Sequence, residues 1–292
     1  MPRGVALNLL FLLNFLHLGA TWTRLYGDGR REHSFAAYLL PAALLILCGA
    51  LVHFEQKGPL LLMVFLANIP HIGLQNFGFI QISAAQKGAW TKVDRDLDKA
   101  YQVAIPLYLA LWFASRPGAD LFHSEAIGLD KIPPVFMATL GTVIGAFALG
   151  VFARMLYLKS EGRPVPRLRG ALHLLYGPGM LAAFVFLPPE LAPIPIAGTH
   201  YIQYLVFVRR YHHRAGPIEG RSPIWGRVHP VIYLLLLACL APGIPIIVNT
   251  ALEPLLGSLI PAIGAAASLH HFLVDGLIWR MREPTMRRRL LV

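Results

Sequence analysis

Nine apolar runs, separated by short polar stretches, limit what this chain can fold into. They lie at 4–24, 35–54, 59–83, 101–115, 133–157, 170–188, 194–213, 228–250 and 257–279. Most approach the ~20 residues that a helix needs to cross a bilayer. A backbone in hydrocarbon must satisfy its hydrogen bonds internally, and an α-helix does so within one segment. The runs therefore predict an all-α, polytopic transmembrane bundle of about nine helices.

The composition supports this fold class and a single integral membrane domain over 1–292. Only 14% of the residues are charged and 56% are hydrophobic, whereas soluble domains carry about 25% charged residues. The polar stretches Trp90–Lys99 and Glu161–Arg169 are interpreted as solvated loops. Cys48 and Cys239 lie in apolar runs and have no CxxC spacing, so both are expected to pack in the core.

The basic residues are distributed unevenly between the two predicted sides of the bundle. Of the 26 lysines and arginines, 22 fall at the ends of the odd-numbered runs and in the tail, and 4 fall on the other side. This asymmetry predicts an N-terminus outside and a C-terminus inside. It accounts for the net charge of +11 without nucleic acid. The tail at 287–289 is expected to touch anionic lipid headgroups.

The first run also has features of a signal peptide, since Arg3 precedes an apolar stretch that ends near Gly19 and Ala20. Asn14 and His17 interrupt that stretch. We therefore expect the run to be retained as the first helix.

Histidine is the polar residue that most sets these runs apart. Seven lie in the runs or at their ends: His17, His71, His173, His200, His229, His270 and His271. An ionisable side chain inside a membrane is costly and is by default a functional-site hypothesis. Neutral histidine is also the commonest metal ligand. The pattern raises the possibility that several histidines converge on one metal.

Helical spacing places polar partners on the same faces as these histidines. Asn14 precedes His17 by three residues. Three further stripes are Asn68, His71 and Gln75; His200, Gln203 and Tyr204; and His271 with Asp275, beside which His270 lies about 100° round the helix. Amides and carboxylates of this kind fix the orientation of metal-bound histidines.

Simpler interpretations apply to single residues. A lone histidine in a span is about as often a hydrogen-bonded interior group, and Trp279 has the position of an interfacial anchor. Asp275 could pair with His271 or with an arginine. The remaining histidines are expected in loops, at interfacial helix ends or on a solvated basic face: His33, His53, His123, His173, His212, His213 and His229.

Four blocks carry a resemblance to a known family. They are His17 in the first run, IPHIG at 69–73, the region of His200, and HHFLVDGLIWR at 270–280. In order and rough spacing they resemble the prokaryotic membrane β-carotene 15,15'-dioxygenases, related to the bacteriorhodopsin-associated protein of haloarchaea. The resemblance implies metal ligands at His17, His71, His200 and His270, and a prokaryotic inner-membrane location.

The sequence departs from that family at two places. Tyr204 stands where the family has a second histidine, and the first block reads FLHLGATW and lacks the family's usual Pro-His-Gly and downstream Asp. His271 is an additional histidine that could replace the missing ligand. A phenol must ionise to bind metal, which a low-dielectric site disfavours. Tyr204 is therefore expected to hydrogen-bond near the site or to narrow the substrate cavity.

The expected function is a non-haem Fe(II) oxygenase that acts with O2 on a lipid-soluble, carotenoid-like or other apolar substrate. Histidine sites of this kind leave coordination positions open. Tyr204 and Asp275 would act at the site, and Asn14, Asn68, Gln75 and Gln203 would support it. Two alternatives remain at this point: a haem or redox protein with axial histidines, and a proton-coupled transporter.

Overall fold

The apolar runs fold into helices, and the part of the chain that the computed structural model describes contains no strand. The structure describes residues 13–14, 16–23, 25, 35–87, 91–116, 129–188, 191–219 and 260–278. The prediction of an all-α fold is confirmed for these residues. The expected helix at 228–250, Cys239 and the basic tail lie outside them.

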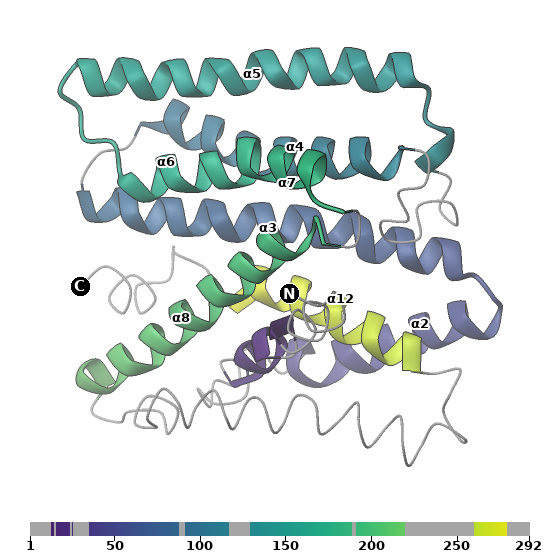
Figure 1. Ribbon diagram of the computed structural model, residues 1–292. Helices are drawn as coiled ribbons and strands as arrows, with labels where there is room; N and C mark the ends of the chain where they lie inside the picture. Colours follow the sequence, from purple (N-terminus) through teal and green to yellow (C-terminus); the bar gives the residue numbers. More distant parts are fainter. Residues whose placement is uncertain are drawn as a thin grey trace. The chain divides into compact units, whose positions relative to one another are not determined.

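The described helices follow the predicted runs closely. The first helical segment lies within 13–25. After it come η2 (Phe35–Leu39), α2 (Leu40–His53), α3 (Lys57–Lys87), α4 (Lys92–Ala114), η3 (Leu129–Lys131), α5 (Pro134–Ser160), α6 (Arg167–Leu174), η4 (Leu175–Gly179), α7 (Met180–Phe186), α8 (Ile194–Glu219) and α12 (Ile260–Ile278), as Figure 1 shows.

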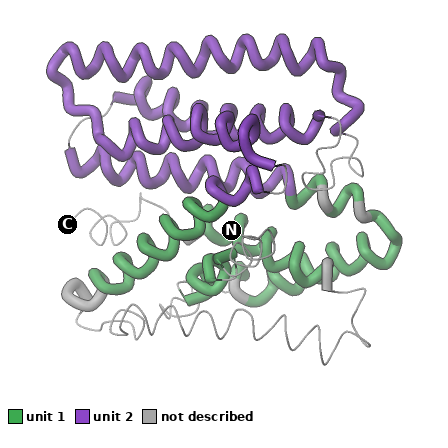
Figure 2. The backbone as a smooth tube through the Cα atoms, viewed as in Figure 1, with its two compact units in different colours: residues 1–64, 197–290, 292 green, residues 65–196, 291 purple. Residues whose placement is uncertain are grey.

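The chain forms two compact units (Figure 2). Unit 1 comprises residues 1–64, 197–290 and 292, and unit 2 comprises residues 65–196 and 291. In unit 1, α12 packs against α2. In unit 2, α4 packs against α5, η4 and α7.

Two of the described helices are long and apolar enough to cross a membrane, namely Gly58–Lys87 and Pro134–Ser160. The second forms α5, whose apolar side chains are largely exposed. Val135, Leu149 and Leu156 are 78%, 71% and 69% exposed. Such a continuous apolar surface is unusual for a protein in water and is typical of a surface that contacts lipid or another protein.

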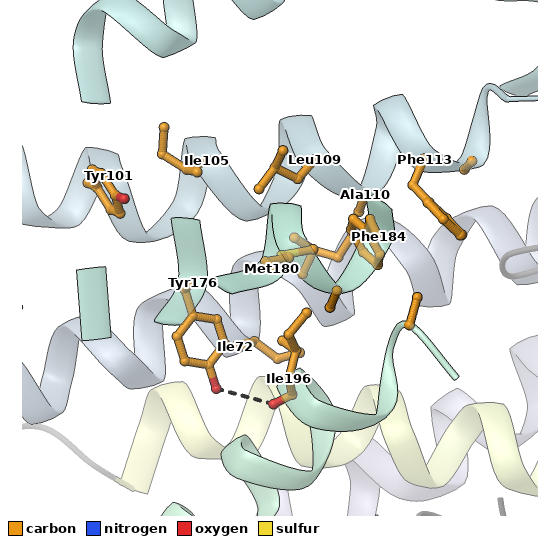
Figure 3. Packing of buried hydrophobic residues seen from close by; sticks show 14 of the residues in the cluster. Ile72, Tyr101, Ile105, Leu109, Ala110, Phe113, Tyr176, Met180, Phe184 and Ile196 are labelled. Carbon is orange, nitrogen blue, oxygen red and sulfur yellow. Dashed lines mark hydrogen bonds between the residues drawn. The ribbon is translucent and has the colours of Figure 1, made fainter. Parts of the chain in front are cut away.

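The core of unit 2 is built on one face of α4. Tyr101, Ile105, Leu109 and Phe113 recur every four residues and are buried (Figure 3). The ring of Phe113 stacks on that of Phe184 from α7, with centroids 4.5 Å apart. The connection into α8 is fixed by Tyr176 and Ile196, because the Tyr176 hydroxyl donates to the Ile196 carbonyl at 3.3 Å.

A π-helical turn, η4, separates α6 from α7 where the sequence reads LYGPG. Pro178 has no backbone N–H and cannot continue an α-helical ladder. The Tyr101 hydroxyl donates to the His173 carbonyl at 2.8 Å. A Cβ at Gly177 would lie 2.1 Å from the Tyr101 hydroxyl oxygen, so only glycine allows this approach.

The start of α4 corrects one sequence interpretation. The stretch Trp90–Lys99 was expected to be a solvated loop, but α4 begins at Lys92 and Thr91 caps it by accepting from the Asp94 amide. Asp94 and Asp98 are 2% and 0% exposed. Buried carboxylates are tolerated only when they are paired, and both are paired here.

Arginines from two neighbouring helices supply that pairing. Arg154 Nε lies 3.0 Å from Asp94 Oδ1, and Arg169 Nε lies 2.9 Å from Asp98 Oδ1. Arg169 had been assigned to a solvated loop and is 2% exposed. His173 had been expected at the membrane interface but is fully buried, with Nε2 3.0 Å from Asp98 Oδ1. The network ties α4, α5 and α6 together.

The network predicts that the stability of the protein falls in acid. Burial would raise the pKa of Asp94, but hydrogen bonds from Thr91 and Arg154 and the nearby arginine charges lower it below its ordinary value of 3.8. A carboxyl with a depressed pKa stabilises the fold above its unfolded pKa, and this contribution is lost as pH falls through the folded pKa. We expect wild-type protein to lose more thermal stability than Asp94→Asn below about pH 4, followed by circular dichroism in detergent. Equal losses would contradict this pairing.

Gly177→Ala tests the approach of Tyr101. The new methyl group would force the Tyr101 hydroxyl away from the His173 carbonyl, and overpacking of this kind costs roughly 1–3 kcal/mol. Gly145→Ala is the matched control, because nothing lies within 4 Å of its added Cβ and alanine favours a helix over glycine. We expect a lower unfolding temperature for the first variant only. If Gly145→Ala destabilises equally, the close approach does not explain the glycine.

Candidate metal centre

Three buried histidines meet in unit 1, and they come from three separate helices. His17 lies in the first helical segment, His200 in α8 and His271 in α12. None is more than 1% exposed. The ring centroid of His17 is 4.7 Å from that of His200 and 4.3 Å from that of His271. The His17 ring therefore lies close to both of the other imidazoles.

The donor atoms of this cluster suit a metal ion. One donor atom of His17 and one of His200 lie within 4.8 Å of each other, and the same holds for His271 and Asp275. Imidazole and carboxylate are donor types that zinc, iron and related divalent ions take. The cluster of buried histidines could thus hold a metal ion.

Tyr204 lies on the same face of α8 as His200, one turn later. It is fully buried, and its ring centroid is 4.4 Å from that of His17. Its hydroxyl donates to Asp275 Oδ1 at 2.7 Å. Buried apolar side chains surround it, contributed by Leu16, Ala20, Leu205 and Val208. The tyrosine thus connects the histidines to the carboxylate in an otherwise apolar setting.

Thr21 is a site residue that the sequence reasoning missed. Its hydroxyl oxygen lies 2.6 Å from the Tyr204 hydroxyl, 2.7 Å from His271 Nδ1 and 3.1 Å from Asp275 Oδ1. Thr21 itself is 0% exposed. Its position four residues after His17 puts both on one helix face. This four-residue spacing from His17 was the one sequence feature that could have pointed to Thr21 as a site residue.

The two adjacent histidines of α12 have different environments. His271 faces His17 and Thr21, whereas His270 Nε2 donates to the Ala36 carbonyl of η2 at 2.7 Å. Successive side chains point about 100° apart on a helix. His271 therefore lies in the cluster, while His270 contacts η2. The resemblance implied His270 as the ligand, but the cluster in unit 1 contains His271.

His71 belongs to unit 2, in the part of α3 that follows Pro70. It is buried, and Asn68 and Gln75 on the same stripe are half-buried. A Cβ at Gly73 would lie 2.1 Å from the Gln102 carbonyl oxygen, so the glycine of the IPHIG segment lets α3 and α4 approach closely. A role for His71 as a metal ligand stays a prediction.

The other candidate residues have varied positions. Asn14 and Gln203 are half-buried. His53 and His213 are exposed, as expected. His212 was expected on a solvated face but is fully buried, and its Nε2 lies 3.4 Å from the Thr23 hydroxyl oxygen. The remaining positions lie outside the described residues: His33, His123, His229 and Trp279.

Comparisons with protein-family models, curated proteins and solved structures give no match to this chain.

Proposed function

We infer that this chain is a membrane-embedded non-haem iron oxygenase that acts on a lipid-soluble substrate. The observation that carries this proposal is the buried cluster of His17, His200 and His271 with Asp275 and Tyr204 beside it. Burying histidines in apolar surroundings costs free energy, so such residues are rare and usually have a function. Three from separate helices that meet at one place support a metal centre more than packing.

In this proposal His17, His200 and His271 hold the metal. When bound, Fe(II) would supply open coordination positions for O2 and substrate. Asp275 accepts the Tyr204 hydroxyl hydrogen, which holds the phenol in place beside His17. The apolar side chains around Tyr204 exclude water and suit a polyene or another apolar chain.

The apolar runs and the charge asymmetry support the membrane placement, and the resemblance implies a prokaryotic inner membrane. We place nine spans in a prokaryotic inner membrane, with the N-terminus outside and the C-terminus inside. The exposed apolar side chains of α5 support contact with lipid. The partners are then the bilayer, anionic headgroups at the basic face, an apolar substrate and O2, with no nucleic acid.

The geometry favours a single ion over haem. Two axial histidines lie on opposite faces of a porphyrin, whereas the rings of His17 and His271 meet edge to face at 4.3 Å. No macrocycle fits between rings at that distance. The optical spectrum distinguishes the two: haem gives a Soret band, and a polyhistidine iron site does not.

The two histidines of α12 provide a matched test of the metal centre. We expect detergent-purified wild-type protein to bind iron, His271→Ala to lose most of it, and His270→Ala to retain it. His270 is engaged with the Ala36 carbonyl, so its loss leaves the cluster intact. The measurements are metal content by mass spectrometry and O2-dependent cleavage of a carotenoid. Iron retained in His271→Ala and lost in His270→Ala would make His270 the ligand.

Topology is tested separately from chemistry. Reporter fusions after Val292 and within the loop at Glu190 should lie on opposite sides of the membrane, because the basic residues gather on one side. A periplasm-active reporter and a cytoplasm-active reporter are placed at each position. Both sites on the same side would reject the nine-span arrangement.

A further inference from the structure

We propose that Thr21 is a positioning residue that fixes the tautomer of His271, so that Nε2 of that ring is the atom that binds metal. This inference depends on the metal centre proposed above. It adds a residue and a mechanism that neither the histidine pattern nor the resemblance indicates.

The Thr21 hydroxyl stands at the centre of a buried hydrogen-bonded group. Around its oxygen lie the Tyr204 hydroxyl at 2.6 Å, His271 Nδ1 at 2.7 Å and Asp275 Oδ1 at 3.1 Å. These are ordinary hydrogen-bond distances. Asp275 also accepts from the Tyr204 hydroxyl at 2.7 Å. All four groups belong to unit 1.

Counting hydrogens sets the direction of these bonds. An ionised carboxylate only accepts, and a hydroxyl has a single hydrogen to give. The Thr21 hydrogen goes toward Asp275, either directly or through the Tyr204 oxygen. Nothing is then left for Thr21 to donate to His271. The short contact to Nδ1 is favourable only if Nδ1 carries the hydrogen and donates it to Thr21.

The tautomer decides which nitrogen can bind metal. A neutral imidazole with hydrogen on Nδ1 presents its lone pair at Nε2. His271 Nε2 lies 3.7 Å from Asp275 Oδ2, the second oxygen of the same carboxylate. The hydrogen bond from Nδ1 to the Thr21 hydroxyl therefore leaves the lone pair of Nε2 available to a cation, near the Asp275 carboxylate.

Two routes lead from Thr21 to Asp275, and they make different predictions. One is the direct bond of 3.1 Å, and the other passes through Tyr204 in steps of 2.6 and 2.7 Å. Tyr204→Phe removes only the second route. Thr21→Val removes both, although valine has nearly the shape of threonine.

The test compares metal affinity in four variants of the full-length protein in detergent: Thr21→Val, Thr21→Ser, Tyr204→Phe and Thr23→Val. Thr23 is the matched control, because it lies on the same helical segment and donates to the Ala20 carbonyl at 2.8 Å. Fe(II) or Co(II) is titrated against a chelator, and the visible spectrum of bound Co(II) reports the ligand geometry. Unfolding temperatures of the metal-free proteins check the fold.

We expect Thr21→Val to weaken metal binding about 10–100-fold, the usual cost of losing a group that orients a metal ligand. Thr21→Ser should restore binding, while Tyr204→Phe and Thr23→Val should remain close to wild type. In Zn(II)-loaded wild type, the ¹⁵N shifts of labelled His271 should report hydrogen on Nδ1, whether or not Thr21→Val folds.

Each contrary result has a distinct meaning. Wild-type affinity in Thr21→Val, or hydrogen on Nε2 of His271, overturns the role of Thr21 and leaves the metal centre standing. Failure of serine to rescue shows that Thr21 acts only through packing. A wild-type protein that binds neither Fe(II) nor Co(II) overturns the proposed function, and the role of Thr21 with it.

Discussion

Polar groups buried without water need partners inside the protein, and this requirement organises both compact units. In unit 2, Asp94 and Asp98 are buried at the start of α4 and are held by Arg154 and Arg169. In unit 1, the buried polar groups are mostly histidines and threonines, and they meet through imidazole rings and hydroxyls. The same constraint thus produces an ion-pair network in one unit and a candidate metal centre in the other.

The sequence predicted helices well where apolar runs are long, because a run of that length has few alternatives to a helix. It failed at the start of α4. The charged stretch there resembles a solvated loop when each residue is considered alone. Asp94 and Asp98 are separated by four residues and share one helix face, but only the positions of Arg154 and Arg169 make their burial favourable. Those arginines are about 60 to 70 residues away in the chain, and local patterns carry no information about them.

The histidines of the candidate site were accessible to sequence reasoning, since ionisable residues in apolar helices are rare. Thr21 was not accessible in the same way. A helical threonine usually bonds to a carbonyl of its own helix, as Thr139 and Thr142 do toward Val135 and Ala138. Locally, only its position four residues after His17 distinguishes Thr21 from these two. The Thr21 hydroxyl bonds to groups of other helices instead, because α8 contributes Tyr204 and α12 contributes His271 and Asp275 around it.

The arrangement around Thr21 also affects how strongly His271 could bind metal. A carboxylate in direct contact with an imidazole N–H both orients the ring and raises the basicity of the ligand nitrogen. Here a hydroxyl stands between them, since His271 Nδ1 contacts Thr21 and Thr21 contacts Asp275. The orienting effect is retained, because the hydrogen bond of 2.7 Å between Nδ1 and the Thr21 hydroxyl fixes the ring. The increase in basicity through Nδ1 is smaller, because the Thr21 hydroxyl lies between that nitrogen and the carboxylate. A ligand held firmly but made only moderately basic would leave a bound metal more electron-poor, and this would favour the coordination of further ligands.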